Sequence, residues 1–206
     1  MDSGITVTGT GQTTAPADLL RLTLNVGHDA PDVAAAVRQV AERTDLVHAA
    51  LRAQGVAADD IETSSVNVFP QYADGMSVAG YRASHSLTVT TRDLTGFGRL
   101  LNAAVDAAGN SLGLDQLQFD IADKQPLIEQ ARELAFRQAS QKAAQLAELS
   151  GQSLGPIAAV AESYSHAPFQ LQAAAGKASD AYASELSVTP GDQKIEVSLD
   201  VRWSWG

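Results

Sequence analysis

The chain of 206 residues contains no cysteine. Disulfide bonds, thiolate catalysis and cysteine-based zinc sites are therefore excluded. The lack of cysteine does not decide the compartment, because an exported protein need not contain disulfides. The sequence also lacks any apolar run close to the roughly 20 residues that a membrane-spanning helix requires. We therefore expect no transmembrane segment in this chain.

Positive charge is scarce: 14 Lys and Arg residues stand against 24 Asp and Glu residues, a net charge of −10. No cluster of basic residues occurs. DNA, RNA and anionic lipid surfaces would be repelled, so we expect no nucleic-acid partner and no electrostatic docking on membranes. The acidity is most simply a solubility property. Aromatic residues make up only 5%, so Ala, Val, Leu and Ile must form most of the core.

The N-terminus, Met1-Asp2-Ser3-Gly4, lacks the basic segment followed by an apolar segment that marks a signal peptide. Strand-like sequence begins almost at once. We therefore expect either a cytoplasmic protein or an exported one in which Met1 stands in place of a removed leader.

Hydrophobic periodicity predicts both strands and helices. Strands are predicted at about 5–10, 20–26, 61–72, 81–91, 117–121, 157–164 and 195–205. Apolar stripes with helical spacing predict helices at about 29–54, 94–108 and 126–150. The first two strands are predicted to form a hairpin around a turn at 11–16. The order β-β-α-β-β-α-β-α-β-β favours an α+β fold, with antiparallel hairpins and three long helices packed on one face.

A weak internal similarity relates two parts of the chain. Helix, glycine, strand and a second strand follow Leu51, and the same order follows Leu149. The length suits a single domain of residues 1–206, or two closely packed lobes. A low-complexity loop of Ala, Ser, Gln and Gly is predicted at about 166–187; such a loop is usually functional, disordered or part of an assembly contact.

Two glycine motifs point to chemistry only at first sight. Gly151-Gln152-Ser153-Leu154-Gly155 fits the G-x-S-x-G pattern, in which a serine nucleophile occupies a turn from strand to helix. Here the motif follows a helix and precedes a strand, so a helix stop is the preferred interpretation. Gly9-Thr10-Gly11 follows a strand, but a dinucleotide-binding loop would lead into a helix, not a further strand. A hairpin turn is preferred there.

Titratable residues do not form a recognisable centre. The histidines His28, His48, His85 and His166 have no metal-binding spacing. Folding could bring His85 near a carboxylate, but structural or solvent-facing histidines are the preferred interpretation. The cluster Asp59, Asp60 and Glu62 lacks the ligand alternation of a calcium loop and is predicted to be a solvated turn. We therefore expect no catalytic residue, no metal site, no cofactor and no enzymatic activity.

The last strand carries the largest apolar side chains. Trp203 and Trp205 share a face with four aliphatic residues between Ile195 and Val201. A ligand platform is conceivable, but burial in the core or in a subunit interface is preferred. The candidate oligomer interface therefore comprises Trp203 and Trp205, together with Phe169 and Leu171 of the preceding segment.

Several segments, taken together, resemble the SIMPL-domain family. They are Val7–Gly11, Gly55 to Phe69-Pro70-Gln71-Tyr72, Gly80–Ala83, Gln130–Ala135 with Lys142-Ala143 and Leu146-Ala147, and Val188–Gly191. The resemblance covers nearly the whole chain, and the order and spacing of these segments are fairly specific. One departure is Pro16-Ala17-Asp18, where the family commonly has Pro followed directly by Asp.

The resemblance implies a bacterial protein of unknown biochemical function, usually exported to the periplasm or cell envelope. The chain looks most like actinobacterial lipoprotein members, whose lipidated cysteine would precede Met1. A brucella periplasmic immunogenic protein of this family looks like a large ring-shaped oligomer, and bacterial members have been linked to protection from oxidative stress. The family has no established catalytic residues, so none can be transferred.

Three functions follow as hypotheses. The preferred one is a non-enzymatic, self-assembling protein of the cell envelope, a homo-oligomer with a stress-protective role. The alternative is a binding module that holds a small apolar ligand or a protein partner in a groove between helices and sheet. A hydrolase using Ser153 is disfavoured. The location is expected to be extracytoplasmic if a leader was removed, with the cytoplasm as the alternative.

Overall fold

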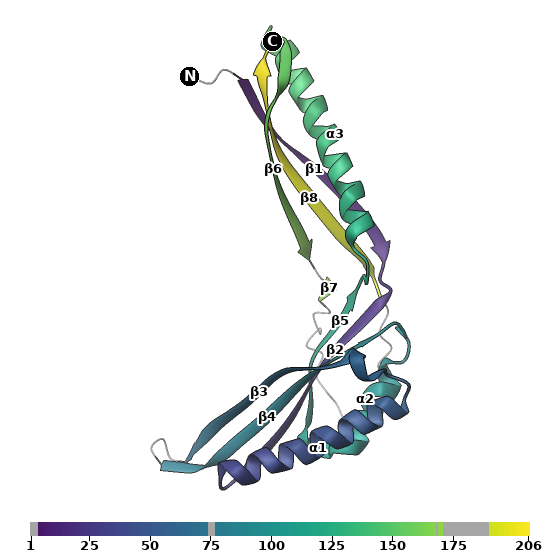
Figure 1. The fold of residues 1–206 in the computed structure, drawn as a ribbon, viewed down its shortest axis with the longest axis vertical. Helices are drawn as coiled ribbons and strands as arrows, with labels where there is room; N and C mark the ends of the chain where they lie inside the picture. Colours follow the sequence, from purple (N-terminus) through teal and green to yellow (C-terminus); the bar gives the residue numbers. More distant parts are fainter. Residues whose placement is uncertain (1–3, 74–76, 168, 171–189) are drawn as a thin grey trace, which may run out of the picture. The chain divides into compact units, whose positions relative to one another are not determined.

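The structure, a computed structural model, describes residues 4–73, 77–167, 169–170 and 190–206. These residues form three α-helices and two antiparallel sheets (Figure 1). The elements are β1 (Gly4–Pro16), β2 (Leu19–Ala30), α1 (Val33–Ala53), β3 (Ile61–Ala73), β4 (Ser77–Thr91), α2 (Phe97–Ala108), β5 (Leu112–Asp120), α3 (Gln125–Leu149), β6 (Leu154–Ala167), β7 (Phe169–Gln170) and β8 (Asp192–Trp205). The predicted α+β class and element order are confirmed, with the two-residue β7 as an addition.

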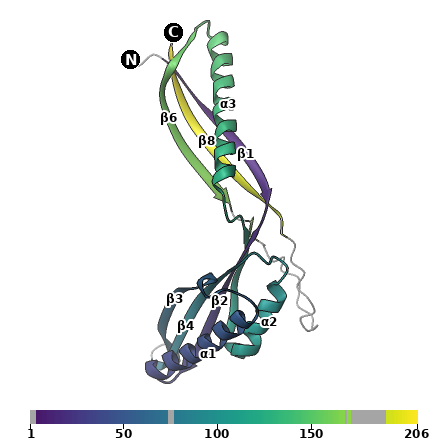
Figure 2. The same ribbon diagram turned by 45° about the vertical axis from the view of Figure 1, so that its right-hand side comes forward.

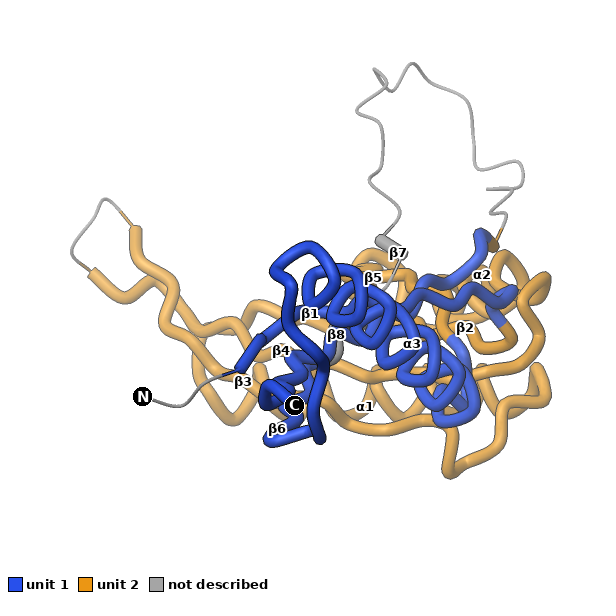
Figure 3. Tube along the Cα trace, turned by 90° about the horizontal axis from the view of Figure 1, so that it is seen from above, with its two compact units in different colours: residues 1–17, 121–169, 191–206 blue, residues 18–120, 170–190 orange. Residues whose placement is uncertain are grey.

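The chain divides into two compact units (Figure 3). Unit 1 comprises residues 1–17, 121–169 and 191–206, and its sheet has the order β1-β8-β6. Unit 2 comprises residues 18–120 and 170–190, and contains most of the sheet with the order β3-β4-β2-β5-β7. Of the helices, α3 belongs to unit 1, and α1 and α2 belong to unit 2. The predicted low-complexity loop at 166–187 lies almost wholly outside the described residues.

The predicted hairpin between the first two strands is wrong. Residues 11–16, predicted as a turn, continue β1, which pairs with β8 along its whole length from Gly4 to Pro16. The next strand, β2, pairs with β4 and β5 in the other sheet. The glycines and Pro16 suggested a turn, but glycine is tolerated in a strand that another backbone approaches closely, and proline is tolerated at a strand end.

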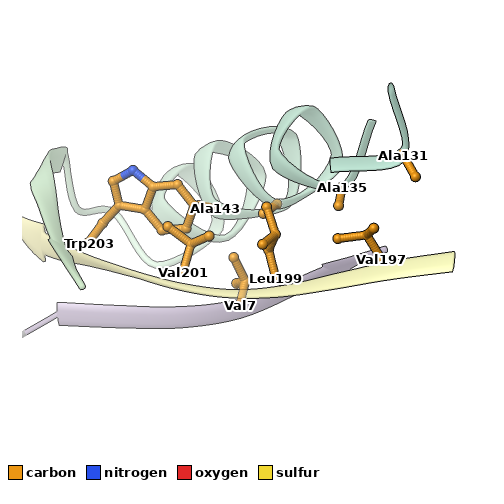
Figure 4. Close-up of a cluster of buried hydrophobic side chains, with 9 residues drawn as sticks. Val7, Ala131, Ala135, Ala143, Val197, Leu199, Val201 and Trp203 are labelled. Carbon is orange, nitrogen blue, oxygen red and sulfur yellow. The ribbon is translucent and has the colours of Figure 1, made fainter. Parts of the chain in front are cut away.

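In unit 1, α3 packs on β1 and β8 through a stripe of alanines (Figure 4). The stripe consists of Ala131, Ala135, Ala139, Ala143 and Ala147, all buried. It faces Val197, Leu199 and Val201 of β8. The small side chains let the helix approach β1 so closely that a Cβ atom at Gly9 would overlap the carbonyl oxygen of Ala135. The Gly9-Thr10-Gly11 motif therefore serves helix packing, not a hairpin turn.

In unit 2, the core lies between the helices and the central strands. The buried face of β2 presents Leu20, Leu22, Leu24 and Val26. The α1 helix begins after Asp32, whose carboxylate accepts a hydrogen bond from the backbone N–H of Ala35 at 2.8 Å. The helix start was predicted earlier, at 29–31. It is later because β2 extends to Ala30, which pairs with Tyr81 of β4.

The predicted internal similarity is present as a shared topology. In unit 2, β2, α1, β3 and β4 form a β-α-β-β arrangement with β4 as the middle strand; in unit 1, β1, α3, β6 and β8 form the same arrangement with β8 in the middle. Both helices also end alike. Gly55 (φ 91°) and Gly151 (φ 66°) follow their C-caps, and Val56 and Gln152 donate backbone hydrogen bonds back to Leu51 and Ala147.

Candidate functional site

The G-x-S-x-G motif is a helix stop, as the order of elements predicted. Gly151 adopts a positive φ directly after the C-cap Ser150, and β6 begins at Leu154. The Ser153 carbonyl accepts a hydrogen bond from the Gly206 N–H at 2.8 Å. Within the described part of the chain, no histidine or carboxylate hydrogen-bonds to the Ser153 hydroxyl. The described surroundings of Ser153 therefore contain no base hydrogen-bonded to its hydroxyl.

A structural or solvent-facing role was predicted for His85, with a nearby carboxylate left open, and Asp45 does lie near enough to act on its charge. His85 is on β4 and hydrogen-bonds through Nε2 to the Thr63 hydroxyl of β3 at 3.0 Å. Burial lowers the pKa of His85 and the nearby His48 lowers it further, while Asp45 acts in the opposite direction. No group of three metal-ligating side chains comes together among the described residues. His85 is therefore a half-buried polar residue that contacts Thr63 of β3 and lies near His48 and Asp45 of α1.

The predicted interface residues divide between described and undescribed parts. Trp203 is only 5% exposed and packs in the core of unit 1 (Figure 4), so its side chain contributes to packing within the protomer. Trp205, two residues further along β8, is half-buried. Phe169 lies in β7, and its side chain, like the whole of Leu171, lies outside the described residues. Their role in an oligomer interface stays a prediction.

An open groove runs along unit 1 beside β6. The α3 helix covers β1 and β8 but leaves the third strand, β6, uncovered (Figures 1 and 2). The groove encloses about 590 Å³ between Phe136 and Ser140 of α3 and Val160 of β6, with Leu199 of β8 at its base. Val160 pairs with Val201 and so points to the helix side of the sheet. It is nevertheless 53% exposed, because no helix among the described residues covers it.

Charged side chains flank this groove. Arg132 donates two hydrogen bonds to Glu162, from Nε at 2.8 Å and from an Nη at 2.9 Å. This contact lowers the pKa of Glu162 and raises that of Arg132. Glu133 and Arg137 also line the groove, and neither has an ion-pair partner among the described residues. The groove is therefore apolar at its base and neutral at its rim.

A second uncovered strand, β3, lies in unit 2. It forms one edge of the five-stranded sheet, and within the described part of the chain it pairs only with β4. Val66 and Val68 pair with His85 and Ala83, on the α1 side, yet Val66 is 60% exposed. Phe69, 59% exposed, pairs with Arg82 and lies on the opposite face. Tyr72, near the hairpin tip, is 62% exposed. Apolar side chains thus meet water on both faces of β3.

The acidic residues before β3 lie where the sequence predicted a solvated turn. Asp59 and Asp60 occupy a short 3₁₀ turn at 58–60, and Glu62 is the second residue of β3. All three side chains are exposed. They give the beginning of β3 a local charge of −3.

In contrast, β1 is an edge strand whose backbone is protected. Gln138 of α3 accepts a hydrogen bond from the Thr10 backbone N–H at 2.7 Å. Lys142 donates one to the Thr8 carbonyl at 2.8 Å. Side chains of α3 therefore take the place of a further strand beside β1. No comparable side-chain bond to the outer backbone of β3 or β6 occurs among the described residues.

The sequence pattern found β3 and β6 as strands but did not mark them as surfaces. Both contain β-branched or aromatic residues, which predict a strand whether it lies in the middle of a sheet or at its edge. One signal was available: β6 has Ala where a buried central strand would carry larger residues. The candidate functional surface consists of these two uncovered edges.

The comparison with known families decides the relationship. The profile of the SIMPL family, described as a protein of unknown function (DUF541), matches residues 5–203. The chain belongs to the SIMPL family. This match spans both units and confirms the resemblance found in the sequence.

Individual SIMPL relatives are distant and bacterial. The chain is 29% identical over 209 residues to a protein of Brucella melitensis named 26 kDa periplasmic immunogenic protein, covering 96% of this chain and 82% of that one. It is 31% identical to the uncharacterized protein YggE of Edwardsiella ictaluri and 30% to that of Escherichia coli K12, covering 76% of this chain and 66% and 64% of theirs. The chain thus spans slightly less than two thirds of the YggE proteins.

Neither the family description nor the relatives' names assign a reaction to the SIMPL fold. Among the described residues, no helix is long and apolar enough to cross a membrane. The uncovered edges of β3 and β6 are consequently the best-defined candidate surfaces on this SIMPL protein.

Proposed function

We propose that this chain is a non-enzymatic protein of the cell envelope that assembles into homo-oligomers. The observation that carries this proposal is that β3 and β6 are long edge strands with exposed apolar side chains, while β1 is protected by α3. Unprotected edges are templates for pairing with another chain. Monomeric proteins usually protect such edges, so edges left open on both units favour assembly.

Light scattering coupled to size-exclusion chromatography tests assembly directly. At micromolar concentration we expect a mass that is a multiple of the one-chain mass of 21.5 kDa. Because strand pairing buries mostly apolar and backbone groups, the mass should change little with salt. A clean monomer across the concentration series would contradict the proposal.

The envelope location is supported by the relative named periplasmic. Fractionation of the native host, with detection by an antibody against this chain, tests it. We expect the protein outside the cytoplasm; recovery with cytoplasmic markers would contradict this location. The stress-protective role implied by the family resemblance would have to work without thiol chemistry, because the chain has no cysteine.

A second candidate function is a binding module for a small apolar ligand or a protein partner. The groove between α3 and β6 favours it, because its base is apolar and open. Native mass spectrometry of protein purified from its own host should then show a bound compound. Phe136→Ala, which removes one wall, should abolish the added mass, and Phe69→Ala in unit 2 should not. A bare protein mass would contradict this function.

A further inference from the structure

We propose that edge strand β6 of one copy pairs with edge strand β3 of the next copy, so that the chains join head to tail. This inference rests on the proposed self-assembly and specifies its contact. The partner is a second copy of this chain. The two strands are the corresponding edge strands of the shared β-α-β-β arrangement, one in each unit.

Backbone hydrogen bonding is the first reason. Among the described residues, β6 pairs only with β8 and β3 only with β4, so within this part of the chain each has one side of its backbone without a strand. On β1, Gln138 and Lys142 provide hydrogen bonds to outer backbone groups that no strand pairs with. Pairing β6 with β3 satisfies both open edges at once and forms a sheet that continues from one copy into the next.

Side-chain size is the second reason. On the face away from α3, β6 presents the small residues Ala159, Ala161 and Ser163, which pair with the polar side of β8. β3 presents larger groups near its end, including the exposed Phe69 and Tyr72. Small residues on one strand leave room for aromatic rings on its neighbour. Self-pairing of β6 would place small side chains against one another and bury little apolar surface.

Charge is the third reason. Asp59, Asp60 and Glu62 give the beginning of β3 a charge of −3. Two β3 strands paired in parallel would place these like charges side by side. Beside β6, the rim of the groove is neutral and includes Arg137, which has no ion-pair partner among the described residues. The acidic end of β3 is therefore better accommodated at β6 than at another β3.

The lengths of the strands set the size of the contact, which backbone pairing alone leaves below that of a standard interface. β3 has 13 residues and β6 has 14, so each spans about 43 Å at ~3.3 Å per residue. A contact of this length and roughly 10 Å height buries about 800 Å² in total. Val66 and Phe69 on β3 and Val160 on β6 add to it, toward the roughly 1,200 Å² at which specific interfaces begin.

Because the two contacting surfaces differ, the interface is heterologous and can repeat. In an open chain of copies, the copy at one end has an unpaired β3 and the copy at the other end has an unpaired β6. Further copies can add there, or the two ends can pair and close a ring. The product is therefore expected to be larger than a dimer. A symmetric contact, β3 with β3 or β6 with β6, would use up that strand in both copies and would stop at a dimer.

Two lysine variants and their mixture test the pairing. Val66→Lys blocks β3, and Val160→Lys blocks β6; both positions are more than half exposed, so circular dichroism should show a native fold. By light scattering, each variant alone is expected to have the mass of one chain. Their equimolar mixture is expected to form a 1:1 dimer, because the intact β6 of one variant meets the intact β3 of the other.

Gln12→Lys is the matched control, since it places the same charge on the exposed face of the protected edge strand β1. It should assemble like the wild type. A dimer of Val66→Lys alone would show β6 self-pairing, and a dimer of Val160→Lys alone would show β3 self-pairing; either would overturn head-to-tail pairing. Full assembly of both variants would show that neither edge is used. A monomeric wild type would instead overturn the proposed self-assembly itself.

Discussion

At the scale of single residues, the structure gives the local surroundings of the side chains that the sequence singled out. Ser153 follows a helix stop, and Trp203 is buried beneath α3. His85 contacts Thr63 and lies near Asp45 and His48. Burial is the largest cause of the lowered pKa of His85. Protonation of His85 therefore depends on how α1 packs against β4.

The lowered pKa of His85 predicts a loss of stability in mild acid. The unfolded chain takes up this proton near the ordinary value of 6.5, before the folded chain does. The free energy of unfolding is therefore highest above that pH and decreases as the pH falls through it, until the folded histidine is also protonated. Urea denaturation between about pH 7.5 and about pH 5.5, a range set by ordinary histidine titration, measures this decrease.

His85→Gln should weaken that pH dependence, because glutamine keeps a hydrogen-bonding group near Thr63 but does not titrate. His28→Gln, on the neighbouring strand β2, is the control and should retain the decrease. If His85→Gln and the wild type lost the same free energy between the two pH values, His85 would not be its source.

At the scale of elements, the contact between α3 and β1 depends on small residues on both sides. The alanine stripe of α3 faces Gly9 and Gly11 of β1, where an added Cβ atom would overlap carbonyl oxygens of the helix. Once the helix lies this close, Gln138 and Lys142 can reach the outer backbone of β1. Close packing and edge protection are therefore two consequences of the same alanine and glycine pattern.

Gly9→Ala is expected to destabilise the protein by about 1–3 kcal/mol, the usual range for an overpacked core. Gly98→Ala is the matched control: Gly98 lies in α2, and an added Cβ atom there meets nothing within 4 Å. Alanine should stabilise that helix by up to ~1 kcal/mol. Thermal denaturation of both variants measures the difference. Equal midpoints for Gly9→Ala and the wild type would contradict the close approach of α3.

At the scale of the whole molecule, unit 2 is placed between β1 and α3 of unit 1 along the chain. The two ends of residues 18–120 meet, because the Asp18 N–H donates a hydrogen bond to the Asp120 carbonyl at 3.1 Å. Such an insertion needs no long connection on either side. The predicted single domain of residues 1–206 can therefore be tested against two lobes that fold separately.

We predict that replacing residues 18–120 with a short Gly/Ser linker leaves unit 1 folded, and that residues 18–120 fold alone. Each unit has its own helix-covered sheet and buried core, so each can satisfy most of its backbone hydrogen bonds. Circular dichroism and cooperative urea unfolding of both fragments provide the measurement. Fragments without a cooperative transition would instead support a single interdependent domain.

The sequence by itself determined the class, the order of elements and the family of this protein. Alternating residues such as those from Ile195 to Trp205, and helical stripes such as Ala131 to Ala147, depend on local periodicity, which is visible in one chain. Strand partners were not determined in the same way. The first two strands looked like a hairpin because they are adjacent, but β1 pairs with β8, nearly the whole chain away.

Only the tertiary structure decided which strands lie at the edges and which of these are covered. Val66 of β3 and Val201 of β8 have the same side chain, yet one is 60% exposed and the other is buried. The difference arises because α3 packs on β1 and β8, whereas no helix of the described residues covers β3 or β6. Local periodicity predicts that a residue belongs to a strand. The burial of that residue depends on which distant elements pack against the strand. The candidate assembly surface is a property of that packing.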